Sequence, residues 1–172
     1  MKRVLITLAL ALPACTGRAA EPDRAQTCTA VVAPPPEFSG WVSSRALTSV
    51  AAQARLASAT FDTGVAIDLR LHPDGQVTYI SLPKGAGEAG SYGGLAQLHV
   101  EHAGIYKVGI GDFAWIDLTR DFKPMPTLSF GHGPECTGIK KVVIYGLEAG
   151  DYAFEVSGEK APSLRVIVVA EG

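Results

Sequence analysis

The sequence predicts an all-β domain built from two packed antiparallel sheets, and three observations carry this prediction. Short apolar runs alternate with polar residues at a period of two, which is the spacing of a half-buried strand. The chain has 19 glycines and 11 prolines among 172 residues, and they lie mainly between these runs, where turns belong. No convincing long helical pattern interrupts the series.

The clearest strand pattern covers residues 65–71, where the apolar side chains that share one side are Val65, Ile67, Leu69 and Leu71. Residues 72–75 (HPDG) predict a turn, because proline fixes φ and glycine accepts a positive φ. A return strand is expected over 76–82, and the glycine-rich stretch 84–94 is expected to be a surface loop. Further strands are expected over 96–100, 105–110, 113–118, 127–130, 140–147, 152–157 and 163–169. The total of eight or nine strands predicts a jelly-roll or immunoglobulin-like sandwich.

The domain organisation follows from composition. Residues 1–20 predict a secretory signal peptide, because Lys2 and Arg3 precede an apolar run over 4–12 that is too short to span a membrane. Residues 21–45 are rich in proline and predict an extended tether. Residues 46–172 then form one sandwich domain, beginning with a short strand over 46–59 for which a helical turn is the alternative.

Two processing routes fit the signal peptide. Residues 12–15 (LPAC) resemble a bacterial lipoprotein box, in which Cys15 is acylated, whereas ordinary cleavage would follow Ala19 or Ala20. Both routes place the mature protein in the periplasm or outside the cell, and only the first attaches it to a membrane. Cys28 and Cys136 remain in either case and predict one disulfide in an oxidising compartment, with two unpaired thiols as the alternative.

The charge balance excludes one class of partner. Fifteen Lys and Arg face 17 Asp and Glu, for a formal net charge of −2, and no basic block or Arg/aromatic stripe is present. Nucleic acid is therefore not an expected partner.

Two family resemblances support an exported sandwich protein. Residues 103–106 (AGIY) and 149–152 (AGDY) repeat a strand opening that resembles bacterial pre-peptidase C-terminal domains over 95–169. In both copies a buried tyrosine ring with its hydroxyl on the backbone is expected.

Residues 92–95 (YGGL), 114–117 (AWID) and 131–141 (GHGPECTGIKK) resemble a group of short exported proteobacterial proteins that carry the label homogentisate 1,2-dioxygenase. The ring-cleaving enzyme of that name is a larger cupin that holds iron with two histidines and one glutamate. This sequence has no His-x-His pair. The resemblance therefore implies shared ancestry with exported sandwich proteins rather than a dioxygenase mechanism.

One candidate metal site combines His132, Glu135 and Cys136, because imidazole, carboxylate and thiolate are ligands of zinc and copper. A cysteine in a disulfide cannot coordinate, so the two interpretations of Cys136 compete.

A second candidate set is His99 and His102 with the intervening Glu101, which could form a facial iron site; the competing interpretation is a solvated polar face. No cofactor is predicted. If either candidate metal site is real, the expected ion is zinc, copper or iron.

Hydrolase, P-loop and dinucleotide motifs do not occur in the sequence, and no catalytic residue is predicted. Trp115 is expected in the core, and Trp41 and Tyr92 are expected as exposed aromatic ligand contacts. The sequence therefore predicts a non-catalytic, exported binding module for a protein or carbohydrate, with contact loops over 85–94 and 132–139. The alternative is a small metal-binding protein or non-haem metalloenzyme that uses His132 and Glu135 with His99 or His102.

Overall fold

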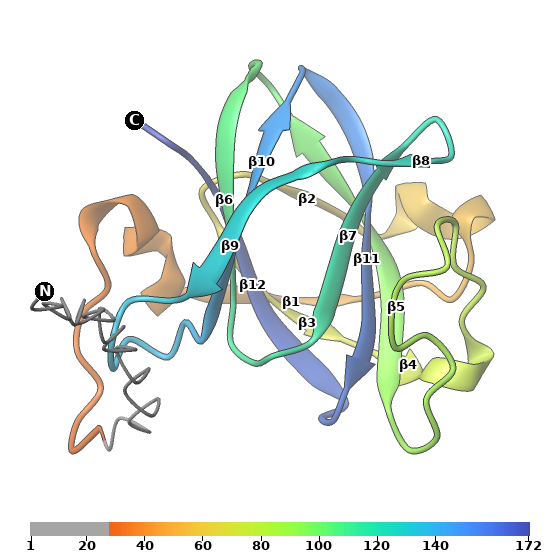
Figure 1. Ribbon diagram of the computed structural model, residues 1–172, viewed down its shortest axis with the longest axis horizontal. Helices are drawn as coiled ribbons and strands as arrows, with labels where there is room; N and C mark the ends of the chain where they lie inside the picture. Colours follow the sequence, from red (N-terminus) through yellow and green to blue (C-terminus); the bar gives the residue numbers. More distant parts are fainter. Residues whose placement is uncertain (1–27) are drawn as a thin grey trace, which may run out of the picture.

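The computed structural model describes residues 28–172 and contains two six-stranded sheets packed face to face, which confirms the predicted two-sheet sandwich (Figure 1). The predicted signal peptide, the two cleavage points and Cys15 lie outside the described residues. Within 28–172, no helix has the length and apolar character needed to cross a membrane.

Sheet A has the strand order β1-β3-β12-β6-β10-β9. The strands are β1 (Ser44–Thr48), β3 (Ala66–Arg70), β12 (Ser163–Ala170), β6 (Gly104–Ile110), β10 (Lys141–Leu147) and β9 (Thr127–His132). All neighbours pair antiparallel except β1 and β3, which are parallel.

Sheet B has the order β2-β5-β11-β7-β8, and β4 also pairs with β5. The strands are β2 (Thr60–Asp62), β5 (Tyr92–Val100), β11 (Gly150–Glu159), β7 (Trp115–Arg120), β8 (Lys123–Pro124) and β4 (His72–Pro73). Here β2 and β5 are the parallel pair. Each sheet thus has one parallel pair at an edge, where only antiparallel pairing was expected. The strand count exceeds the prediction because β2, β4 and β8 are too short to produce a two-residue period.

The main core lies between the sheets and follows the predicted alternation. Leu98 of β5, Phe154 of β11, Val108 of β6 and Val166 of β12 are all fully buried in it. Each such side chain contributes about 1.5–3 kcal/mol relative to an exposed position. The alternating apolar residues therefore account for the packing of the two inner faces.

The two AG-x-Y openings form the expected framework contacts. The Tyr106 and Tyr152 rings are buried. The Tyr106 hydroxyl donates to the carbonyl of His102 at 2.7 Å, and the Tyr152 hydroxyl donates to that of Glu148 at 2.9 Å. Each tyrosine thus bonds the backbone four residues earlier, at the turn that leads into its strand, and the predicted role is confirmed.

The outer face of sheet A is covered by an N-terminal arm, residues 28–42. Its 3-10 helix η1 (Pro36–Val42) buries Phe38 and Trp41 in a second, smaller apolar cluster with Ile139 and Ile167. The expected tether therefore ends well before residue 45. The high proline content of this segment predicted a tether, although two of its large apolar side chains, Phe38 and Trp41, pack on the sheet.

A disulfide joins Cys28 of the arm to Cys136, across a sequence separation of 108 residues. The Val32 amide also donates to the carbonyl of Cys136 at 2.9 Å. The structure thus contains the predicted bridge, and the arm is fixed to sheet A at both of its ends.

The outer face of sheet B is covered differently, by residues 74–91, which we call the sheet B cover. The return strand expected over 76–82 does not form: a short 3-10 turn, η3 (Asp74–Gln76), is followed by irregular chain. This chain lies over the outward side of β11, where Glu155 is fully buried. The Glu155 carboxylate accepts from the Ile80 amide at 2.8 Å and from the Thr119 hydroxyl at 2.6 Å. Residues 76–82 are therefore held on sheet B by hydrogen bonds to the Glu155 carboxylate rather than by backbone pairing with a neighbouring strand.

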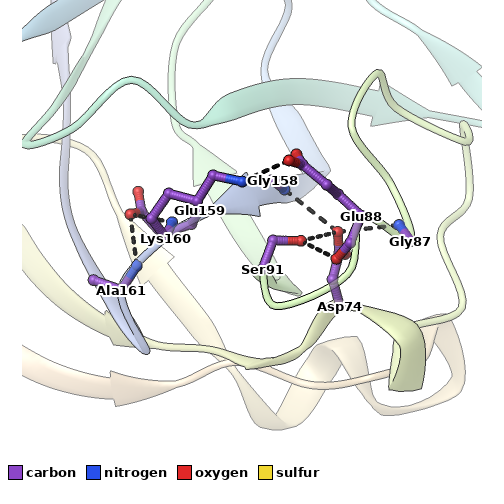
Figure 2. Close-up of polar contacts among 8 residues, drawn as sticks. All are labelled: Asp74, Gly87, Glu88, Ser91, Gly158, Glu159, Lys160 and Ala161. Carbon is purple, nitrogen blue, oxygen red and sulfur yellow. Dashed lines mark hydrogen bonds and ion pairs between the residues drawn. The ribbon is translucent and has the colours of Figure 1, made fainter.

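Asp74 fixes the other part of this cover (Figure 2). Its buried carboxylate accepts from the Gly87 amide and the Ser91 hydroxyl, both at 3.0 Å, and from the Tyr79 hydroxyl. A Cβ at Gly93 would lie 2.7 Å from Asp74 Oδ1, so only glycine allows β5 to pass so close to this carboxylate.

Residues 46–59 combine both predicted alternatives. They begin with most of β1 and end with the 3-10 helix η2 (Gln53–Ser58). Strand and helical turn therefore occupy successive parts of this segment.

Candidate functional site

The two tryptophans occupy the opposite environments from those predicted. Trp41 is 5% exposed and packs on sheet A, so the prediction that it is an exposed ligand contact is wrong. Trp115 is 40% exposed, so the prediction that it lies in the core is wrong as well. The phase of β7 explains the second error, because Ile116 and Leu118 face the core and therefore turn Trp115 outward. This alternation was a usable signal in the sequence.

Tyr92 and the glycine-rich loop have structural tasks. Tyr92 begins β5 and is half-buried against the main core, so residues 92–94 belong to a strand rather than to the expected loop. The rest of that loop belongs to the sheet B cover, which Asp74 holds in place. Lys160 adds an ion pair with Glu88 at 2.6 Å (Figure 2).

The structure does not gather the predicted metal ligands. His99 lies on β5 of sheet B and pairs with Asp151 at 2.7 Å, and His102 lies in the turn before β6. His132 ends β9 of sheet A, and Glu135 lies in the following loop beside the disulfide-bonded Cys136. Across residues 28–172, no group of three or more His, Cys, Asp or Glu side chains is arranged to hold a metal ion. The metal alternative gains no support from this geometry.

An aromatic strip lies where the edge of sheet A meets sheet B. Its members are Phe113, Trp115 and Phe130, which are 61%, 40% and 75% exposed, together with the exposed His132. Phe130 and His132 stand on the same side of β9, two residues apart, and the Phe113 and His132 rings meet edge to face at 5.9 Å. The strip therefore continues from β9 across to the start of β7.

Two lysines flank Trp115. The ammonium nitrogens of Lys84 and Lys141 lie 5.5 and 5.4 Å from the centre of its ring, within the range of cation–π attraction. Lys141 is also the cross-strand partner of His132, so it links Trp115 to the β9 part of the strip. Lys84 immediately precedes the predicted contact loop 85–94, and His132, which begins the other predicted loop, is opposite Lys141 on the neighbouring strand. The Trp115 ring, which both lysines approach, is therefore near one end of each predicted loop.

Burial shifts the pKa values of several groups near Trp115. Burial raises the pKa of Asp117, whose carboxylate accepts from the Trp115 indole N–H at 3.1 Å. Burial lowers the pKa of Lys141, whose ammonium donates to the carbonyl of Ala114 at 3.0 Å. Burial also raises the pKa of Tyr145 to about 12. Perturbed titration in a partly exposed cluster is typical of functional sites.

The exposed groups of the strip are suited to contact with a ligand. Exposed aromatic faces take up flat apolar surfaces, and two ammonium groups beside one ring attract an anion. Phe113, Phe130, Lys84 and Lys141 were not predicted as site residues, because the pairing of β9 with β10 and the path of the sheet B cover bring them near Trp115.

Comparison of the chain with protein-family models, with curated proteins and with solved structures finds no match. Both family resemblances stated for the sequence therefore stay predictions.

Proposed function

We propose that this protein is a non-catalytic binding module that acts after export, with its ligand lying across the aromatic strip. One observation carries this proposal: Phe113, Trp115 and Phe130 expose large apolar surfaces and are linked through the contacts of His132 and Lys141. Contiguous exposed aromatics usually mark a site of interaction, since exposing them to water costs free energy that contact with a partner recovers.

The strip stands on a rigid base, which suits recognition. Trp115 is held by its bond to Asp117, and β9 and β7 are each paired with a strand that contributes to the main core. Little conformational entropy is then lost when a ligand binds, so more of the contact energy becomes affinity. Export is supported by the signal-peptide pattern of residues 1–20 and by the disulfide, which forms in oxidising compartments.

Trp115 itself supplies the test. The chain has two tryptophans, so the Trp41→Phe variant reports the environment of Trp115 alone by fluorescence. This variant is titrated with a panel of soluble polysaccharides, peptidoglycan fragments and extended peptides. We expect saturable emission changes with at least one of these ligands.

Matched substitutions assign the binding to the strip. Phe113→Ala or Phe130→Ala should weaken the affinity by about tenfold or more, as for a residue that dominates an interface. Phe122→Ala removes an equally exposed ring at the β7–β8 turn and should change the affinity less than about twofold. Absence of saturable binding by every member of the panel, or affinity that ignores the two strip substitutions, overturns the proposal.

A further inference from the structure

The two ammonium groups beside Trp115 form no direct ion pair with a carboxylate of the described residues. Within residues 28–172, neither Lys84 nor Lys141 forms an ion pair, whereas Lys107, Lys140 and Lys160 each do. Asp117 is close enough to Lys141 to affect its titration, yet its contact is with the Trp115 indole. Within the described residues, the strip therefore carries two ammonium groups, neither in an ion pair, and one nearby carboxylate, that of Asp117.

Both lysines are held in place. Lys141 donates to the Ala114 carbonyl, which fixes its ammonium. The backbone of Lys84 is fixed because its carbonyl accepts from the Ser157 hydroxyl of β11 at 3.0 Å. One ammonium of the site, that of Lys141, is thus fixed, and the other extends from an anchored backbone.

The geometry limits the shape of the ligand. Because both ammonium nitrogens lie within 5.5 Å of the centre of one indole ring, an anion that contacts either ammonium also lies close to that ring. A fitting ligand thus carries a flat apolar face and an anionic group in a single chemical unit. A uronic acid has both, since its pyranose ring presents a face of C–H groups and bears a carboxylate at its edge.

We propose that the ligand of the aromatic strip is an acidic polysaccharide of the uronate type, with a sugar ring on Trp115 and its carboxylate between Lys84 and Lys141. This inference rests on the proposed function and adds the ligand class. Successive sugar units then lie along the strip toward Phe113 and Phe130, whose rings offer further apolar faces.

Two other anionic polymers fit the site less well. An acidic peptide carries its apolar surface and its carboxylate on different side chains, so it does not place both against one ring. A single-stranded nucleic acid requires a groove lined with basic side chains that follows the phosphates. Lys140, which precedes Lys141 in the chain, does not extend such a groove because it pairs with Asp112 at 3.5 Å. Both polymers are nevertheless outcomes of the test.

The test compares polygalacturonate with its methyl ester, because the two share one backbone and differ in charge. Binding is followed by the fluorescence of Trp115 in the Trp41→Phe variant, with polyglutamate and oligothymidylate as further ligands. We expect polygalacturonate to bind at least about tenfold more tightly than the other three. Raising the salt concentration from 0.15 to 1 M should weaken its binding, because salt screens exposed charges.

Lysine substitutions give the second arm. Lys84→Gln and Lys141→Gln should each weaken polygalacturonate binding by about tenfold and leave the methyl ester unaffected, and the control Lys123→Gln should change neither. Lys84 is on the surface, so its variant remains informative even if Lys141→Gln destabilises the fold.

The failures of the two proposals are distinguishable. Equal binding of the ester, or tighter binding of polyglutamate or oligothymidylate, overturns the uronate inference; the proposed function survives such a result if Phe113→Ala still weakens the binding. Loss of saturable binding for all ligands, including the wider panel, overturns both.

Discussion

The two sheets have outer faces that are covered by opposite chemistry. On sheet A the cover is the N-terminal arm, which contributes buried Phe38 and Trp41 and is closed by the Cys28–Cys136 disulfide. On sheet B the cover is residues 74–91. Two buried carboxylates hold it in place: that of Asp74, within the cover, and that of Glu155 on β11.

This difference shows two ways to fix an irregular segment on a sheet. An apolar cover gains free energy from area removed from water, and the disulfide lowers the entropy of the unfolded chain. A polar cover depends on hydrogen bonds whose loss leaves a buried group without a partner, which costs about 1–3 kcal/mol or more for a charged group. The first cover should therefore be sensitive to reduction and the second to single-atom changes at its carboxylates.

The largest expected effect comes from breaking the disulfide. The double variant Cys28→Ala/Cys136→Ala should lose about 4–5 kcal/mol of unfolding free energy, because the bridge closes a loop of more than 100 residues. Urea unfolding measures this loss. Hydrogen exchange should show faster exchange of the Val32 amide in the variant while the Ile80 amide of the sheet B cover keeps its protection. Equal loss of protection at both amides would mean that the two covers are not independent.

A smaller effect is expected from Trp41→Ala, which removes the largest side chain of the arm from its cluster. It should destabilise the protein by about 3–4 kcal/mol, as for other buried aromatic truncations. Trp115→Ala is the matched control, because the exposed ring should contribute about 1 kcal/mol or less. Thermal unfolding of both variants checks the order, and a larger cost for Trp115 would contradict the assigned environments.

On sheet B, Asp74→Asn tests the polar cover while keeping the shape of the side chain. An amide has one carbonyl oxygen, so it cannot accept from all the donors that surround Asp74, and we expect a loss of about 2–3 kcal/mol. Glu88→Gln removes only the exposed pair with Lys160 and should cost about 0–1 kcal/mol. If the two substitutions had equal effects, the carboxylate of Asp74 would not be what fixes this cover.

The smallest effect concerns an exposed pair outside both covers. Its hydrogen bond to Asp151 raises the pKa of His99 above its ordinary value. A raised folded-state pKa means that this pair stabilises the protein while His99 is protonated, fully below about pH 6.5, and that the contribution is lost as pH rises through the raised value. An NMR titration of the imidazole should show the raised pKa, and Asp151→Asn should bring it back down. An unchanged pKa in that variant would assign the shift to another group.

The sequence predicted the strands well wherever one face meets the main core. Residues 96–100 and 152–157 lie within β5 and β11 as expected, because burial between the sheets imposes the period of two. The same reasoning failed over 76–82, where Tyr79 and Ile80 resemble strand residues. Their hydrogen bonds go instead to the backbone carbonyl of Val156 and to the carboxylate of Glu155, both far along the chain. A local pattern does not contain such partners.

The candidate site was the least predictable part. Alternation in β7 could have placed Trp115 outside, since its neighbours Ile116 and Leu118 face inward. Nothing local, however, connects Lys84 to Lys141, because their meeting depends on how the sheet B cover crosses β11. The disulfide was predictable since two cysteines remained after the signal peptide and allow one pairing.

The position of β12 has a consequence for how the chain acquires its structure in the cell. This strand is the last in sequence among the described strands, yet it lies inside sheet A, between β3 and β6. Until a ribosome has released it, sheet A consists of two separate pieces, β1-β3 and β6-β10-β9. Joining these two pieces into one sheet therefore requires β12, so assembly of sheet A as a whole has to follow synthesis of this strand.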